Sequence, residues 1–451
     1  MPSRKPVAPA APEPAPVRRA RVAPPPRAAD VAILGAGAAG ITAARRLLAL
    51  GLSVVLIEAR DRVGGRALTA RLAGQAVDLG AHWLHAADDN GLVREARRLG
   101  LPLFDAPQEP RLILGARGAD ALETRAFHEA WAEVDDAIAE IGAGRDLAPA
   151  SAALDRLGPR AQPWRAVLAF AHGPFACGAS LDAIGAADFA AARDDLDLFV
   201  AGGYGALVAR LADGLPVALA TRATRIDWSG REVRVETDSG TLAARALVVT
   251  VPVPILARGD TARGDIVFDP PLPAPTRDAL AALRPASYEH VVLAWPGGPL
   301  REAANTTVAF DGDAEANLGL LANFDGGVLH YADLGGALVG RLGSPQARAG
   351  FVRESLGARF GRDAVADLRV LHASGWGEDP LSACAWTIAP PGAHGARAVL
   401  RDPIGGRILL AGEATSSTLW GTIGGAWAEG ERAAREVAGM LAGMPAGETV
   451  C

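Results

Sequence analysis

Three glycines near the amino terminus, followed by an acidic residue, have the spacing that binds a dinucleotide. Gly35, Gly37 and Gly40 form a G-x-G-x-x-G turn directly after the apolar run 31–34. In such a turn the first glycine permits a tight bend, the second lets the backbone approach a pyrophosphate, and the third allows close packing of helix on strand. Glu58 stands 18 residues beyond Gly40, where its carboxylate would accept hydrogen bonds from ribose hydroxyls.

The segments around these residues predict the elements that would position them. The run 31–34 predicts a buried strand, 41–50 a helix that Gly51 ends, and 53–57 a second apolar strand. The N–H groups at the start of the helix would point at the pyrophosphate. Because strand, turn, helix and distal acid agree, the pattern favours a nucleotide-binding fold over a chance glycine turn, although NAD and FAD share it.

The residues that follow resemble the flavin-containing amine oxidase family. The strings EARDRVGGRALT over 58–69 and DLGAHW over 78–83 look like the family's continuation from the second strand to the isoalloxazine ring. By this resemblance, Arg60 lies near the adenosine phosphates, and Gly65 and Arg66 lie near the ribityl chain and the flavin. An arginine can form a charge-assisted bond to phosphate, and glycines let the backbone pass close to a flat ring.

Two later segments fit the same family, and the resemblance covers most of residues 30–440. The middle of the chain predicts a helix and a β-hairpin, where the backbone of Ala223 would meet the adenine. Residues 407–426 resemble the family's carboxy-terminal FAD signature, in which Glu413 would contact the ribityl chain or the pyrophosphate. A helix starting there would direct N–H groups at the pyrimidine edge and stabilise the negative charge of reduced flavin. The predicted cofactor-binding residues are Gly35, Gly37, Ala39, Gly40, Glu58, Ala59, Arg60, Gly65, Arg66, Ala81, His82, Trp83, Ala223, Trp376, Gly412, Glu413, Thr422 and Ile423.

The resemblance also assigns residues to the substrate side of the flavin. Trp376 and Trp386 lie in a matching segment, and Trp386 occupies the position of an aromatic cage residue, although either tryptophan could be a core residue instead. Members with covalent flavin carry a cysteine directly before that aromatic, whereas this chain has Ala385 there and Cys384 one place earlier, which predicts noncovalent FAD. His85 matches a polyamine oxidase histidine that borders the substrate channel, or it is a solvated loop residue.

The lysine that many members place near flavin N5, where it holds a water, is missing. The only lysine of the chain is Lys5, and His290 aligns with the family position on a predicted strand. Either His290 holds the water, as a positioned histidine can, or the reactivity with oxygen is altered. The alternative is a strand histidine that is satisfied elsewhere.

These residues predict FAD-dependent oxidation of an amine to an imine, with oxygen or another acceptor reoxidising the flavin, and name His290, Trp386 and His85 as candidate catalytic residues. An L-amino acid oxidase is one alternative, weakened because His82 and Trp83 stand where such enzymes carry a carboxylate-binding arginine. An FAD-binding protein with little turnover is another, because the family lysine is missing and the second cage aromatic is replaced by a threonine.

Composition narrows the remaining classes. With a net charge of −6 and a pI near 5.8, the 451-residue chain has no basic stripe for nucleic acid. No uncharged apolar run approaches the roughly 18 residues of a membrane helix, since Pro252 and Pro254 break the best candidate, 247–256. Three cysteines without paired spacing suggest neither a disulfide framework nor a metal site, so the cytoplasm is the expected compartment. Export is the alternative, because Arg18 and Arg19 of the tail could form a twin-arginine signal.

The order of the segments predicts an α/β protein in which a Rossmann-like FAD-binding domain is interleaved with an α+β substrate-binding domain. Residues 1–29, rich in proline and arginine, predict a disordered tail. The expected FAD-binding domain is discontinuous, as is the substrate-binding domain, and their ranges are 30–83, 202–256 and 395–445 for the first and 84–201 and 257–394 for the second. A small-molecule amine would bind between them.

Overall fold

The computed structural model describes residues 26–107, 109–144, 147–193, 196–258, 266–300 and 304–443. Most of the predicted disordered tail, 1–29, lies outside these ranges. Its last residues do not belong to a tail, because the first strand begins at Ala28. Within the described ranges, no helix has both the length and the apolar character that crossing a bilayer requires.

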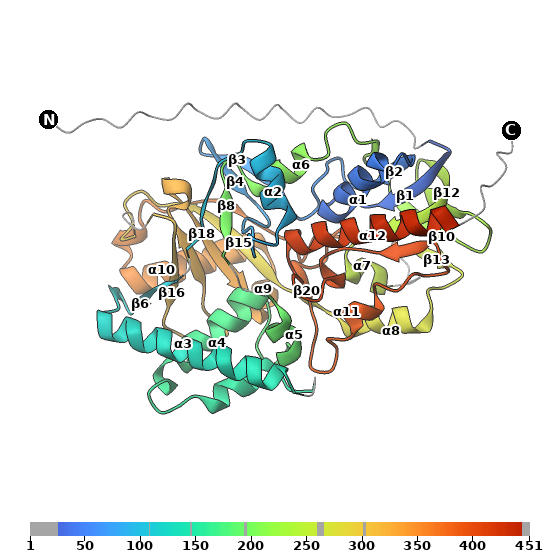
Figure 1. Ribbon diagram of the computed structural model, residues 1–451. Helices are drawn as coiled ribbons and strands as arrows, with labels where there is room; N and C mark the ends of the chain where they lie inside the picture. The colour runs from blue at the N-terminus through green and yellow to red at the C-terminus, as the bar shows by residue number, and fades with distance from the viewer. Residues whose placement is uncertain are drawn as a thin grey trace.

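An eight-stranded sheet carries the predicted nucleotide fingerprint, and it lies on the right in Figure 1. Its order is β13-β10-β11-β12-β1-β2-β9, and β21 also pairs with β12. The strands at its centre pair in parallel and are continuous apolar runs, because both of their faces are covered. The strands are β1 (Ala28–Leu34), β2 (Val54–Ile57), β9 (Val217–Ala218), β10 (Ala223–Asp227), β11 (Val233–Thr237), β12 (Gly240–Val249), β13 (Val267–Asp269) and β21 (Ile408–Leu410).

Two helices from opposite ends of the chain, α1 (Ala38–Ala49) and α12 (Ile423–Gly443), pack against each other on this sheet. Helix α1 begins inside the glycine turn, with Gly37 as its N-cap, rather than after Gly40 as the sequence suggested. The first N–H groups of the helix therefore lie within the fingerprint itself.

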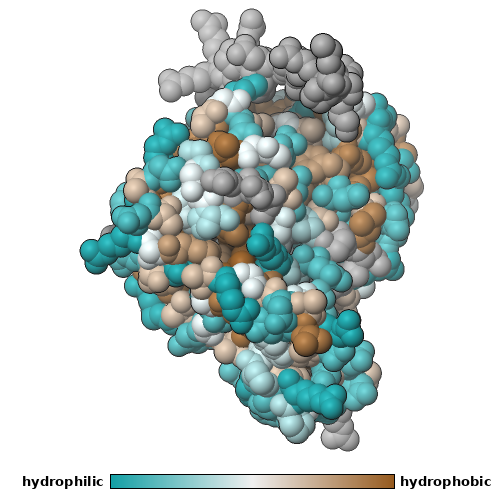
Figure 2. All heavy atoms as spheres, turned by 90° about the vertical axis from the view of Figure 1, so that its left-hand side faces the viewer, coloured by the Kyte–Doolittle hydropathy of each residue, from teal (hydrophilic) through white to brown (hydrophobic). Residues whose placement is uncertain are grey.

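A seven-stranded sheet forms the other half of the molecule, on the left in Figure 1. Its order is β19-β15-β18-β17-β16-β6-β7, antiparallel except where β16 pairs with β6. Figure 2 looks onto this half and shows small apolar areas scattered among hydrophilic side chains. The strands are β6 (Arg111–Leu114), β7 (Arg117–Gly118), β15 (Tyr288–Ala294), β16 (Thr306–Phe310), β17 (Gly319–Ala322), β18 (Leu329–Gly335) and β19 (Arg369–Ala373).

Helices cover this second half, and short strand pairs connect the two halves. The long helix α3 (Ala121–Gly142) packs against α5, below the sheet in Figure 1. The remaining helices of both halves are α2 (Gly91–Arg98), α4 (Arg165–Phe170), α5 (Ala186–Ala191), α6 (Tyr204–Arg210), α7 (Val253–Ala257), α8 (Ala274–Ala282), α9 (Ala337–Leu342), α10 (Pro345–Phe360) and α11 (Ala396–Val399). The short pairs are β3 (Thr69–Leu72) with β4 (Gln75–Asp78), β5 (Leu103–Asp105) with β8 (Leu198–Val200), and β14 (Arg284–Ala286) with β20 (Trp386–Ile388).

Short helical turns complete the chain. One of them, η3 (Ala171–Phe175), is a π-helical turn that continues α4. The 3₁₀ turns are η1 (Ala150–Arg156), η2 (Gln162–Trp164), η4 (Phe324–Gly326), η5 (Asp363–Val365) and η6 (Glu413–Thr415).

One strand bears on the proposed boundary at residue 257. Strand β13 pairs with β10 in the nucleotide-binding sheet, although it lies within the range 257–394 proposed for the other domain. Leu280 of α8 belongs to the same apolar core as Leu247 of β12. The proposed boundary at residue 257 therefore moves, because the segment that carries β13 and α8 packs on the nucleotide side.

Candidate active site

A cavity of about 540 Å³ joins the glycine fingerprint to residues of the second half. Its volume lies in the range of ordinary ligand sites. Every predicted site residue lines this cavity except Gly40, including the candidate catalytic residues His290, Trp386 and His85. The structure therefore brings together residues that lie far apart in the sequence, while their individual roles stay predictions.

The fingerprint glycines meet two different constraints. A β-carbon on Gly40 would lie 1.9 Å from the carbonyl oxygen of Gly35, so this glycine is required by the packing of helix on strand. A β-carbon on Gly37 would meet only the α-carbon of Gly65, at 3.9 Å, because this position faces the cavity. The protein leaves space at Gly37 that the close approach of a pyrophosphate would use, and the residues fit FAD.

Glu58 is fixed at the end of β2 by two backbone groups. Its Oε2 accepts from the N–H of Ala36 at 2.8 Å, and its Oε1 accepts from the N–H of Arg60 at 2.8 Å. The buried carboxylate lines the cavity, where ribose hydroxyls were expected to reach it. The Arg60 guanidinium donates to Asp379 at 2.7 Å and to Ser382 at 2.8 Å, which ties the fingerprint to a loop near the carboxyl end.

Arg66, which is partly exposed, and the buried Glu413 form an ion pair that joins two predicted FAD segments. Both terminal nitrogens of Arg66 donate to Glu413 Oε1 at 3.2 Å, and Nη1 also donates to the Ala385 carbonyl at 2.7 Å. Burial opposes the charged guanidinium, but the Glu413 carboxylate more than offsets this and raises the pKa of Arg66. Glu413 Oε2 accepts from the Thr387 hydroxyl at 2.9 Å. This pair ties the two segments together at the cavity that both of them line.

The cysteine next to the covalent-linkage position does not line the cavity. Ala385 lines it, whereas the Cys384 sulfur lies 3.6 Å from Nη1 of Arg66. Burial raises the pKa of the Cys384 thiol to about 12, so it is not a ready nucleophile. Strand β20 begins only at Trp386, so these two residues lie in the turn before it rather than on the strand. The geometry agrees with the predicted noncovalent FAD.

Tryptophans form an aromatic wall of the cavity. The indole N–H of Trp386 donates to the Cys177 carbonyl at 2.9 Å, and that of Trp420 donates to the Asp188 carbonyl at 2.9 Å. The Tyr288 ring lies 5.2 Å from that of Trp386. Because both N–H groups are satisfied within the protein, the rings present aromatic surface to the cavity they line. Trp420 thus occupies this wall, although the sequence has a threonine at the second cage position.

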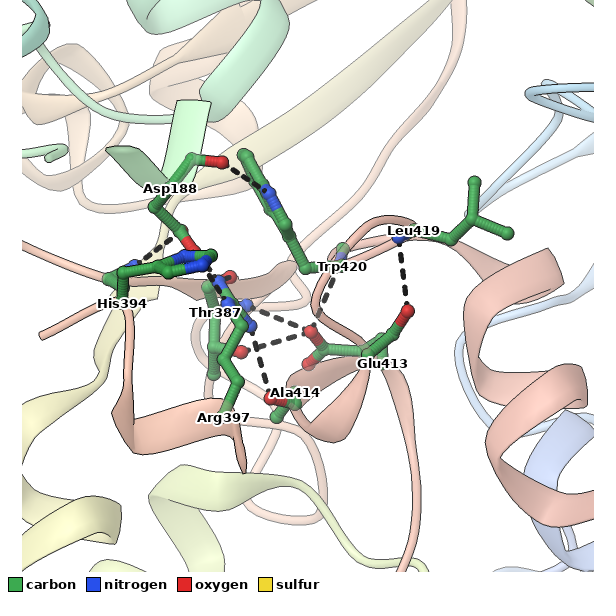
Figure 3. A network of polar contacts seen from close by, with 11 residues as sticks. Asp188, Thr387, His394, Arg397, Glu413, Ala414, Leu419 and Trp420 are labelled. Carbon is green, nitrogen blue, oxygen red and sulfur yellow. Dashed lines mark hydrogen bonds and ion pairs between the residues drawn. The ribbon is translucent and has the colours of Figure 1, made fainter. Parts of the chain in front are cut away.

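The polar network behind Trp420 is shown in Figure 3. Arg397 and Asp188 are fully buried and form a bidentate pair, with Nε and Nη2 of the guanidinium each 2.8 Å from a carboxylate oxygen. The Arg397 guanidinium also lies over the Trp420 ring, 5.2 Å from its centre. Arg397 Nη2 donates to the Thr387 carbonyl at 3.1 Å, which continues the network toward Glu413. Trp420 is therefore held at its edge and on its face.

Both ring nitrogens of His290 are hydrogen-bonded inside the protein. Nδ1 lies 2.5 Å from Asp333, and Nε2 donates to the Gly80 carbonyl at 3.0 Å. The Gly80 carbonyl can only accept, so Nε2 carries a proton, and the Asp333 carboxylate favours a second proton on Nδ1. Burial works against the resulting charge, but Asp333 outweighs it and raises the pKa of His290. The ring lines the cavity, and its partners favour the charged form.

His82 differs from His290 in its charge and in its hydrogen bonding. Its ring lies 4.9 Å from that of His290 and stacks on Tyr331 at 4.6 Å. Neither ring nitrogen has a hydrogen-bond partner in the described part of the chain. Burial and the charge of His290 lower the pKa of His82 well below its usual value, so the ring is neutral.

His85 and several residues that sequence reasoning missed line the half of the cavity away from the fingerprint. His85 Nδ1 pairs with Asp197 at 2.8 Å, and its ring lies parallel to Trp83 at 6.0 Å. The missed residues come from α3, η3, α5 and the loops that follow α5, and one comes from the start of β15. No motif in these segments marked them. They are Trp131, Asp135, His172, Phe175, Phe189, Arg193, Asp197 and Tyr288.

The fold and the cavity define a protein that holds a dinucleotide in a Rossmann-like sheet and opens this site toward a second, mostly antiparallel sheet. A model of the family described as flavin containing amine oxidoreductase matches residues 38–438. The chain belongs to this family, and FAD is its cofactor. These findings confirm the predicted family, the α/β fold class and the cofactor.

Individual relatives cover the chain almost completely. Lysine-specific histone demethylase 2 from Homo sapiens is 27% identical over 450 residues, which cover 91% of this chain and 53% of the demethylase. Polyamine oxidase 2 from Arabidopsis thaliana is 28% identical over 458 residues, which cover 91% of this chain and 88% of that protein. The chain spans about half the length of the histone demethylases that it matches.

Solved structures share the fold. The structure of putrescine oxidase bound to putrescine superimposes with a TM-score of 0.75 at 22% identity and covers 91% of this chain and 99% of that one. Cyclohexylamine oxidase from Brevibacterium oxydans IH-35A gives a TM-score of 0.75 at 21% identity and covers 92% and 99%. These solved structures therefore share the fold of this chain, a Rossmann-like domain combined with a substrate-binding domain.

Substitutions at two glycines should separate cofactor binding from folding. Gly37→Val should leave the stability of the FAD-free protein nearly unchanged but weaken FAD binding by roughly 5- to 150-fold, because the side chain enters the cavity at a steric cost of about 1–3 kcal/mol. Gly40→Val should instead lower the melting temperature of the FAD-free protein. Flavin absorbance after gel filtration and thermal unfolding measure the two effects, and an equal loss of stability in both variants would contradict the assignment.

The FAD should be released by acid. Ala385 offers no nucleophile at the linkage position, and the Cys384 thiol is held at Arg66 with a raised pKa. Precipitation of the protein with trichloroacetic acid should leave the yellow colour in the supernatant. Flavin that stays with the pellet would show a covalent bond and refute this expectation.

Proposed function

We propose that this protein oxidises an amine to an imine with FAD, and that oxygen or another acceptor then reoxidises the flavin. The observation that carries the proposal is the continuity of one cavity from the FAD fingerprint to the aromatic wall formed by Trp386 and Trp420. The carbon next to nitrogen loses a hydride equivalent and the nitrogen loses a proton, so the amine is oxidised by two electrons. FAD, when bound, supplies the two-electron acceptor for this step.

Residues that line the cavity favour an uncharged amine. At the wall formed by Trp386, Trp420 and Tyr288 the cavity is lined by aromatic rings, and such an apolar surface favours the neutral form of a nitrogen that lies against it. Trp386 and Trp420 are held by hydrogen bonds at their edges, so their rings can orient an amine without moving.

An amino acid oxidase would need a cation for the substrate carboxylate. Three of the four arginines that line the cavity already pair with acidic side chains, and the pairs are Arg60 with Asp379, Arg66 with Glu413 and Arg193 with Asp89. Each of these three would have to give up a partner to bind a carboxylate. The fourth, Arg222, adjoins Ala223 at the predicted adenine end, and the ring nitrogens of His290 are taken by Asp333 and the Gly80 carbonyl. The cavity therefore supports amines without a neighbouring carboxylate as the substrate class.

Anaerobic mixing tests the proposed reaction directly. The FAD-loaded protein should lose its oxidised-flavin absorbance with alkyl monoamines, diamines or polyamines, and it should lose little with L-amino acids. Reduction by amino acids alone would favour the amino acid oxidase reading. No reduction by any compound of the panel would favour a flavoprotein with little turnover and would overturn the proposal.

His290 is proposed to supply the positive charge that the family lysine carries elsewhere. Its two ring nitrogens are occupied by Asp333 and the Gly80 carbonyl, so what it offers the cavity is charge rather than an open hydrogen-bonding position. Oxygen gains negative charge as it accepts electrons, and a positive charge held at the cavity wall favours that step.

His290→Ala should therefore slow flavin reoxidation by oxygen by roughly 10- to 100-fold, and should slow reduction by amine much less. His290→Lys restores a cation at this position and should recover part of the rate, whereas His290→Gln should not. Stopped-flow absorbance measures each half-reaction separately. Equal effects of His290→Ala on both half-reactions, or none on either, would assign His290 a packing role.

A further inference from the structure

One wall of the cavity is built by α3 and by the π-helical turn η3. Trp131 and Asp135 stand four residues apart on α3, so they share one face of the helix. That face meets His172 of η3, whose ring lies 4.3 Å from the Trp131 ring. All three side chains line the cavity, and the proposed reaction uses none of them.

His172 fixes the Asp135 carboxylate. The buried ring donates from Nδ1 to the Leu168 carbonyl at 2.9 Å, since a carbonyl can only accept. Its other nitrogen, Nε2, lies 3.0 Å from Asp135 Oδ1, so the ring holds this oxygen in place. Oδ2 of Asp135 accepts no hydrogen bond from the part of the chain that the structure describes. The carboxylate is thus held by one oxygen and offers the other.

Asp135 is also the most accessible of the carboxylates described along the cavity. Its side chain is 45% exposed, compared with 17% for Asp197 and 6% for Glu413. Glu58 is buried and bound to backbone N–H groups. A cation that enters from solvent can therefore reach Asp135, while the other acids are committed to partners. The neighbouring Trp131 offers an aromatic face, to which cations are also attracted.

The charged groups along this part of the cavity leave a place for a cationic ligand. Asp197 is a second lining carboxylate, paired with His85, and the positive charge of the lining arginine Arg193 is offset by Asp89. A primary alkylamine has a pKa near that of lysine, about 10.4, so a second amino group of a substrate would arrive as an ammonium ion. The reacting nitrogen and this second nitrogen need opposite environments, and the cavity contains both.

We propose that Asp135, held by His172 and flanked by Trp131, binds the second ammonium group of the substrate, so that the enzyme prefers alkyl diamines and polyamines over monoamines. This inference rests on the proposed amine oxidation, and it assigns specificity to residues of α3 and η3. The ammonium donates to Asp135 Oδ2 while His172 keeps the other oxygen. No covalent step is involved.

Binding of amines that cannot react tests the inference apart from turnover. 2,5-Dimethylhexane-2,5-diamine and 2-methylhexan-2-amine have no hydrogen on the carbon that bears nitrogen, so neither can be oxidised. Calorimetry with the FAD-loaded protein should show tighter binding of the diamine. Asp135→Asn should weaken diamine binding by roughly 10- to 100-fold, as expected for loss of one charge-assisted hydrogen bond, and leave the monoamine within about twofold. Asp136→Asn, at the exposed neighbouring position of α3, is the matched control and should change neither.

Anaerobic reduction gives the second readout. In Asp135→Asn, reduction of the flavin by butane-1,4-diamine at low concentration should slow by the same factor as binding weakens, while reduction by butan-1-amine should not. Equal losses for both amines, or no loss for either, would overturn the inference. If no amine reduces the wild-type flavin, the proposed function fails, and diamine binding that still depends on Asp135 would leave the ammonium site in place.

Discussion

The buried ion pair between Asp188 and Arg397 is the interaction on which the shape of the candidate site depends. It joins α5 of one half to α11 of the other, and neither side chain reaches solvent. Removing one partner would leave an unpaired buried charge, which costs about 3–5 kcal/mol. Through the carbonyl and hydroxyl of Thr387 the pair is linked to Glu413, and through it to Arg66. One continuous network therefore fixes the aromatic wall relative to the FAD fingerprint.

The parts of the site that could be predicted are those whose chemistry is local in the sequence. The glycine turn and Glu58 lie within one strand-helix-strand unit, so their spacing already encodes their geometry. The signature around Glu413 is equally local, because the turn η6 and the start of α12 follow β21 directly. Residues such as Trp386 and His290 were found only through the resemblance to a family, since nothing in their own segments distinguishes them from core residues.

The parts that could not be predicted depend on contacts between distant segments. Asp188 and Arg397 are 209 positions apart. His290 lies opposite Asp333 in the pairing of β15 with β18, and no local sequence pattern predicts that pairing. The charge state of His290 follows from these partners, not from its residue type. The boundary proposed at 257 was misplaced for the same reason, because three residues of β13 pair with residues of β10 that lie 42 positions earlier.

The π-helical turn η3 makes the cavity wall built by α3 and η3 sensitive to the insertion or deletion of a single residue. It sits inside an otherwise regular helix and holds Pro174, whose missing N–H cannot form an ordinary α-helical bond. Such a turn accommodates one residue more than an α-helical turn. Insertion or deletion of one residue in this turn would rotate one flank of the helix relative to the other by about 100° around the axis. Evolution could thus change which amines this scaffold accepts through one insertion or deletion, with the FAD fingerprint untouched.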